Sequence, residues 1–131
     1  MKRIVAFILA LVMVFALCGC SSESREEKQY NKAIKLLNEG KYSDAQKIFE
    51  ELGDYKYSKS KVCECMIKDI NYWYIVHKSD LMAAQAASKA LEYYQSLSKD
   101  EQSDVSNKDE LWSEDKIIEV RMKILTDALS N

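Results

Sequence analysis

Apolar residues recur every three or four positions from Tyr30 to the end of the chain, which is the spacing of amphipathic helices. One apolar stripe begins at Tyr30 and ends before Gly40, and a second begins at Tyr42 and ends before Gly53. Glycine accepts the left-handed backbone that closes many helices, so both glycines mark helix ends. Because only two or three residues separate the two helices, we predict an antiparallel helical hairpin over residues 29–53.

The next segment predicts a pair of long helices over residues 58–97. The apolar residues of the first helix, about residues 58–76, form one broad stripe: Val62, Cys63, Met66, Ile67, Ile70, Trp73 and Tyr74. Three more apolar residues lie off that stripe: Cys65, Tyr72 and Ile75. A helix that is apolar on more than one face has neighbours on more than one side, so we place it centrally. The second helix is expected over residues 80–97.

Residues 98–130 predict a short helix followed by a capping helix. Ser98 and Glu101 have the spacing of a capping box, in which each side chain accepts a backbone N–H of the first turn. The final helix is expected from about Lys108 to Ser130, with this apolar stripe: Leu111, Ile118, Met122, Leu125 and Leu129. Since stacked hairpins leave an apolar face uncovered, we expect this stripe to face inward as the lid of the stack.

The start of the chain has a different pattern. Lys2 and Arg3 precede an unbroken apolar run over residues 4–17, and a polar stretch begins at residue 21. A helix over this run rises only about 21 Å, which is shorter than the ~30 Å hydrocarbon core of a bilayer. The basic start and the length of the run therefore indicate an export signal peptide over residues 1–19. An uncleaved signal-anchor helix and a buried core helix are the alternatives.

Residues 17–20, Leu-Cys-Gly-Cys, resemble the lipobox of bacterial lipoproteins, which has the order Leu, small residue, Gly or Ala, Cys. The resemblance implies cleavage after Gly19 and a diacylglycerol on the thiol of Cys20, with a further acyl chain on its amine. Two chains anchor a protein lastingly, whereas one holds it only marginally. We therefore expect Cys20 to anchor the chain to the cell membrane, on the extracytoplasmic face. Residues 20–28 would form a polar tether to a single domain over residues 29–131.

Within the first hairpin, the run AIKLLNEGKYSDAQKIFEELGDYKYS resembles a tetratricopeptide (TPR) hairpin. In that repeat a small residue of the first helix packs against an Ala of the second, which would be Ala33 and Ala45. A Gly-x-Tyr turn joins the helices, here Gly40 to Tyr42. The ending Leu-Gly-Asp-Tyr-Lys is similar to that of repeat-bearing lipoproteins of Gram-positive bacteria, and the pattern returns more faintly over residues 79–87. The resemblance implies an all-α, TPR-like array of stacked hairpins with a C-terminal capping helix.

Composition favours an all-α domain and excludes other classes. Of 131 residues, three are Gly and none is Pro, which is too little turn chemistry for an all-β sandwich or a glycine-rich phosphate loop. Without residues 1–19 the chain holds 17 basic against 21 acidic residues. The basic patch around Lys59 faces no arrangement of aromatic residues for stacking bases, so we expect no nucleic-acid partner.

The sequence carries little catalytic or metal chemistry. His77 is the single histidine, whereas metal ligation needs three or four partners. Cys63 and Cys65 point about 200° apart on one helix, which is poor geometry for a disulfide. We expect free buried thiols, or one exposed and reactive thiol. Since the chain has no nucleophile elbow, no H-E-x-x-H and no phosphate loop, we predict no enzyme, no metal and no cofactor.

These observations predict a lipid-anchored helical scaffold that binds a protein or peptide outside the cytoplasmic membrane. The alternative is a structural or accessory subunit of an envelope, transport or secretion assembly, which would have the same architecture. If the first hairpin presents a groove, Tyr30 and Ile34 are the candidate partner-binding residues. The interpretation that we favour is that the central helix buries these two side chains instead.

Overall fold

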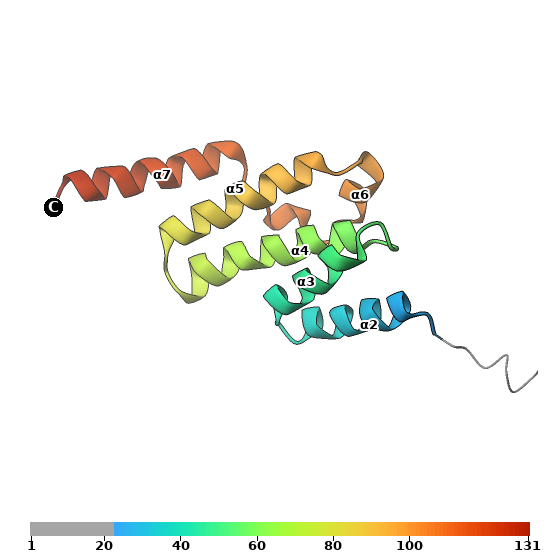
Figure 1. The fold of residues 1–131 in the computed structure, drawn as a ribbon. Coiled ribbons are helices and arrows are strands. Elements are labelled where there is room, and N and C mark those ends of the chain that lie inside the picture. The colour runs from blue at the N-terminus through green and yellow to red at the C-terminus, as the bar shows by residue number, and fades with distance from the viewer. Residues whose placement is uncertain (1–22) are drawn as a thin grey trace, which may run out of the picture.

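The computed structural model describes residues 23–131, and the secondary structure of this part of the chain is entirely helical (Figure 1). The α-helices are α2 (Arg25–Asn38), α3 (Tyr42–Leu52), α4 (Ser58–Asn71), α5 (Asp80–Ser96), α6 (Lys99–Asp104) and α7 (Glu114–Leu129). A π-helical turn, η1 (Tyr72–Val76), continues α4, and a 3-10 turn, η2 (Lys108–Glu110), precedes α7. The all-α prediction is confirmed for the described residues, while Gly19 and Cys20 lie outside them.

The long helices pack side by side in chain order. α2 contacts α3, α3 contacts α4, α4 contacts α5, and α5 contacts α7. Short connections turn the chain back after each of the first three helices, so neighbouring helices are antiparallel (Figure 1). The result is a row with α2 at one end and α7 at the other, and with α6 against α4.

The first hairpin has the predicted turns but starts earlier than expected. Gly40 (φ 78°) and Gly53 (φ 56°) both take the positive φ that was predicted for them. α2 begins at Arg25 because the Ser24 hydroxyl caps it, accepting the backbone N–H of Glu27 at 3.1 Å. Acidic residues in the first turn favour the same start. The first turn of α2, expected to belong to the polar tether, is therefore helical.

α4 is the central helix, as predicted, and separates two clusters of buried side chains. The first cluster joins α4 to the first hairpin and consists of Ala33, Ala45, Phe49, Val62 and Cys65. The second joins α4 to α5 and the C-terminal segment, with these members: Cys63, Ile67, Ile70, Ala83, Ala87, Ala90, Leu97, Val105, Trp112 and Ile117. Cys63 and Cys65 are free and buried, one in each cluster, as their opposite directions on the helix require.

A buried carboxylate ties the segment between α6 and α7 to α4. Glu64 is only 4% exposed, and its carboxylate accepts the backbone N–H of Ser106 and the ammonium of Lys61, both at 2.9 Å. The side-chain amide of Asn107 donates to the Glu64 carbonyl at 3.2 Å. The predicted capping box is present at the start of α6. These contacts hold the segment between α6 and α7 against α4.

The orientation expected for the last helix is wrong. α7 begins at Glu114, after an N-cap at Ser113, and not near Lys108. This start turns Ile117, which is 4% exposed, toward the second cluster, and leaves the partly buried Leu111 ahead of the helix. The stripe expected to face inward is exposed instead: Ile118 (52%), Met122 (58%), Leu125 (57%) and Leu129 (88%). α7 thus packs on α5 through a different face and leaves these four side chains, the α7 stripe, in solvent.

Candidate functional site

The two candidate partner-binding residues, Tyr30 and Ile34, lie on the inward side of α2. Both are half-buried and pack against the first cluster. The ring of Tyr30 meets those of Phe49 and Tyr55 edge to face, with centroids 5.6 and 6.0 Å apart. α4 contributes two residues to the same cluster. Both side chains therefore pack in the core of the first hairpin, and the ring contacts of Tyr30 go to α3 and the α3–α4 loop rather than to the central helix.

A polar network fastens the α3–α4 loop to α2 beside Tyr30. The Tyr55 hydroxyl donates to one oxygen of Glu27 at 2.5 Å, and the Lys56 ammonium donates to the other at 2.7 Å. The same ammonium lies 5.2 Å from the centroid of the Tyr30 ring. The bond from Lys56, followed by that from Tyr55, lowers the pKa of Glu27, and the pKa of Lys56 is raised in return. This end of the row is thus closed by both apolar and charged contacts.

Within residues 23–131, Cys63, Cys65 and His77 lie in three different packed environments. Burial raises the pKa of both the Cys63 and the Cys65 thiol to about 12, which favours the protonated thiol over the thiolate. The ring of His77 meets that of Tyr72 edge to face and that of Trp73 at a tilt, with centroids 4.5 and 5.0 Å away. Within residues 23–131, the His, Cys, Asp and Glu side chains form no group of three that would hold a metal ion.

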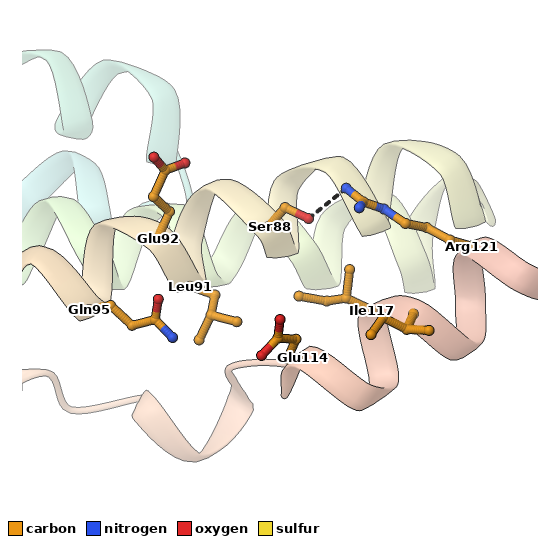
Figure 2. A pocket seen from close by; sticks show the side chains of 8 residues that line it. Ser88, Leu91, Glu92, Gln95, Glu114, Ile117 and Arg121 are labelled. Atoms are coloured by element: carbon orange, nitrogen blue, oxygen red, sulfur yellow. Dashed lines mark hydrogen bonds between the residues drawn. The ribbon is translucent and has the colours of Figure 1, made fainter.

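A groove of about 210 Å³ lies between α5 and α7 (Figure 2). Its walls are Ser88, Leu91, Glu92 and Gln95 from α5, and Glu114, Ile117, Ile118 and Arg121 from α7. Two polar contacts join the helices: the Arg121 guanidinium donates to the Ser88 hydroxyl at 2.8 Å, and Lys123 pairs with Asp80 at 2.9 Å. α7 is therefore held against α5 by its packed apolar face and by the contacts of Arg121 and Lys123. The flank that carries Ile118 stays open.

The α7 stripe extends this groove along the open flank of the helix. Ile118 lines the groove, and the stripe continues from it at steps of four, three and four residues. This spacing is the seam that one helix presents to another. Contiguous exposed apolar surfaces often mark interaction sites, whereas single exposed apolar residues do not.

Sequence reasoning found the α7 stripe but missed the second apolar face of the same helix. Ile117 and Val120 pack against the second cluster and take the inward place that was assigned to the stripe. The signal that points to this arrangement is Ser113, a good N-cap residue followed by two acidic residues. Placing the helix start there separates Leu111 from the stripe.

Among the helices of residues 23–131, none combines the length and the apolar character that a membrane span needs. We find no match for this chain among protein-family models, curated proteins or solved structures. Its function is therefore inferred from its own residues and contacts.

Proposed function

We propose that this chain is a lipoprotein, anchored through Cys20 to the extracytoplasmic face of the cell membrane, whose helical domain is a scaffold for a protein partner. The anchor rests on residues 17–20, Leu-Cys-Gly-Cys, which follow a basic start and an apolar run of signal-peptide length. α2 begins at Arg25, so only residues 21–24 separate the lipidated cysteine from the first helix. Such a short connection keeps the domain close to the membrane.

The architecture proposed for the domain is a short TPR-like array. α2 and α3 form one antiparallel hairpin, α4 and α5 form the next, and α7 packs on α5 as the last helix of the row. The small residues assigned to the contact between the first two helices, Ala33 and Ala45, are both fully buried in one cluster. Stacked helices of this kind present extended surfaces, which such arrays use to bind other proteins.

The α7 stripe is the observation that carries the scaffold function. Its four side chains are between 52% and 88% exposed and lie on one flank of a helix whose opposite side is packed. Leaving them in water forgoes about 25 cal/mol for each Å² of apolar surface that a partner would cover. The fitting partner is an amphipathic helix whose apolar residues lie along α7, as in other helix-to-helix recognition.

The anchor is tested by two matched substitutions in the full-length chain. Cys20→Ser should abolish labelling by a radioactive fatty acid and release the protein from the membrane fraction or leave it as an unprocessed precursor. Cys18→Ser, two residues away within the proposed signal peptide, should keep both labelling and fractionation. Normal labelling of the Cys20→Ser protein would refute the lipid anchor.

The interaction surface is tested by making the stripe polar. Membranes from cells that express the full-length chain are crosslinked, and captured proteins are quantified for the unaltered chain and two variants. Met122→Gln combined with Leu125→Gln should reduce the capture of a stoichiometric partner several-fold. Thr126→Gln, on an exposed position beside the stripe, should leave it unchanged. Equal capture by the double variant, or no stoichiometric partner at all, would count against the scaffold and favour an inert spacer.

A further inference from the structure

A second concave surface lies where the start of α3 meets the end of α4. A hollow of about 310 Å³ there is lined in part by Tyr42, Gln46, Asp69, Tyr72 and Trp73. A hollow of about 280 Å³ adjoins it, since Tyr42, Asp69 and Tyr72 line both, and extends past Gly40 to Asp44. We call the two together the α3–α4 groove. It lies apart from the groove between α5 and α7 and from the α7 stripe.

The aromatic rings of the α3–α4 groove are held in place without being covered. Tyr72 is 42% exposed, yet its ring contacts Trp73 and His77 edge to face, with centroids 5.3 and 4.5 Å away. Tyr72 opens the π-helical turn η1, in which its carbonyl accepts the backbone N–H of His77 at 3.2 Å. Single π-helical turns occur frequently at functional sites. The turn thus presents a supported ring to the groove.

The carboxylates of the α3–α4 groove have no cation in contact with them. Within residues 23–131, neither Asp44 nor Asp69 forms an ion pair, and Lys41, which also lines the groove, is engaged by Glu39 at 3.0 Å. Partial burial raises the pKa of the Asp69 carboxyl, and the Trp73 indole and the charge of Lys89 oppose this only in part. Asp69 is exposed at the groove surface, so an incoming cation can reach its carboxylate, and the adjacent aromatic rings can stabilise that cation.

We propose that the α3–α4 groove binds a lysine or arginine side chain of an extended peptide segment, with the cation against the rings of Tyr42 and Tyr72 and with Asp69 as its counter-charge. Aromatic faces attract ammonium and guanidinium groups, and a carboxylate adds a charge-assisted hydrogen bond. The occupant is an extended peptide segment because the groove continues from Trp73 past Tyr42 to Asp44, beyond the place where a single cation would meet Asp69. That the peptide belongs to a protein partner rests on the proposed function. The α3–α4 groove is nevertheless a different surface from the α7 stripe.

The test uses the two tryptophan indole N–H resonances of the full-length chain in a non-ionic detergent, because Trp73 borders the groove and Trp112 does not. Titration with acetyl-Gly-Lys-Gly-amide or its Arg counterpart should shift the Trp73 resonance saturably and leave that of Trp112 in place. The norleucine peptide, which lacks the charge, should give no saturable shift. Raising NaCl to about 0.5 M should weaken binding several-fold, since salt screens exposed charge.

Substitutions identify the groups that bind. Asp69→Asn and Tyr72→Leu should each weaken peptide binding by at least about five-fold, which corresponds to the loss of one cation contact. Asp109→Asn and Tyr57→Leu remove the same groups from exposed positions outside the groove and should change nothing. Asp44→Asn, at the far end of the groove, should cause a smaller loss, and provides a second reading if Asp69→Asn fails to fold.

Three results would overturn the inference: an equal shift with the norleucine peptide, unchanged binding by both the Asp69→Asn and Asp44→Asn proteins, or tighter binding of tetramethylammonium than of either peptide. The last would identify a site for small cations. None of these outcomes depends on lipidation or on the α7 stripe, so this inference and the proposed scaffold function fail separately.

Discussion

The two terminal helices of the row, α2 and α7, differ in how much of their apolar surface is buried. Each packs mainly on one long helix, α3 for the first and α5 for the second. α2 leaves no large apolar side chain exposed, whereas four such side chains of α7 are more than half exposed. A row of helices is closed at an end when the outer helix uses all of its apolar surface inward. By that criterion the row is closed at α2 and open at α7.

The difference arises from how the apolar residues are distributed around each helix. In α2 they occupy one arc, which packs on the first cluster together with Tyr55 from the α3–α4 loop. In α7 they occupy two arcs, one headed by Ile117 and the other by Ile118. A single neighbouring helix covers only one arc. The second arc of α7, the α7 stripe, therefore has no neighbouring helix to pack against within the described residues.

The largest loss of folding stability is expected from a substitution in the first cluster, which α2 covers. Phe49 is fully buried between α2 and α4, so Phe49→Ala should lower the free energy of unfolding by about 3–5 kcal/mol, measured by urea denaturation. Leu129→Ala, at an 88% exposed position of the α7 stripe, should change it by less than about 0.5 kcal/mol. Comparable losses for the two variants would contradict an open end at α7.

A closer comparison uses two adjacent isoleucines of α7. Ile117→Ala should cost about 2 kcal/mol, because the side chain is 4% exposed within the second cluster. Ile118→Ala should be nearly neutral, because its side chain is 52% exposed and alanine suits a helix at least as well. Thermal unfolding of both variants measures the difference, and equal losses would mean that both faces of α7 are covered.

The smallest change in stability is expected from the ion pair of Glu27 and Lys56, which joins α2 to the α3–α4 loop. The pKa of Glu27 is lowered in the folded protein, so its ionised form favours folding. This contribution is fully present above the usual glutamate pKa and is lost as the pH falls through the lowered value. Glu27→Gln should therefore flatten the dependence of stability on pH in the acidic range, measured by urea denaturation at several pH values. Glu119→Gln, on α7, keeps the Glu27 network and should keep the dependence.

Much of the fold was predictable because its signals are local. Gly40 and Gly53 have the backbone that their positions after apolar stripes implied, and Ser98 caps α6 as its spacing to Glu101 required. The central place of α4 followed from apolar residues on more than one of its faces. Each of these inferences needs only a few neighbouring residues, since periodicity and capping act within one helix.

The remaining features depend on contacts between distant segments. Ile117 and Ile118 each begin an apolar face of α7, and only the contact with α5 and the second cluster distinguishes the packed face from the exposed one. The role of Tyr30 likewise depends on Phe49 and Tyr55, which come from other elements. The periodicity of one helix names its apolar residues but does not say which of them meet a neighbour.

The placement of Cys63 and Cys65 gives the molecule two internal reporters of cooperativity. Each thiol is shielded in its own cluster, one facing the α2 end of the row and the other facing the α7 end. A thiol reagent reaches either sulfur only when that half of the row opens. The ratio of the two modification rates therefore measures whether the closed and the open end unfold as one unit or separately.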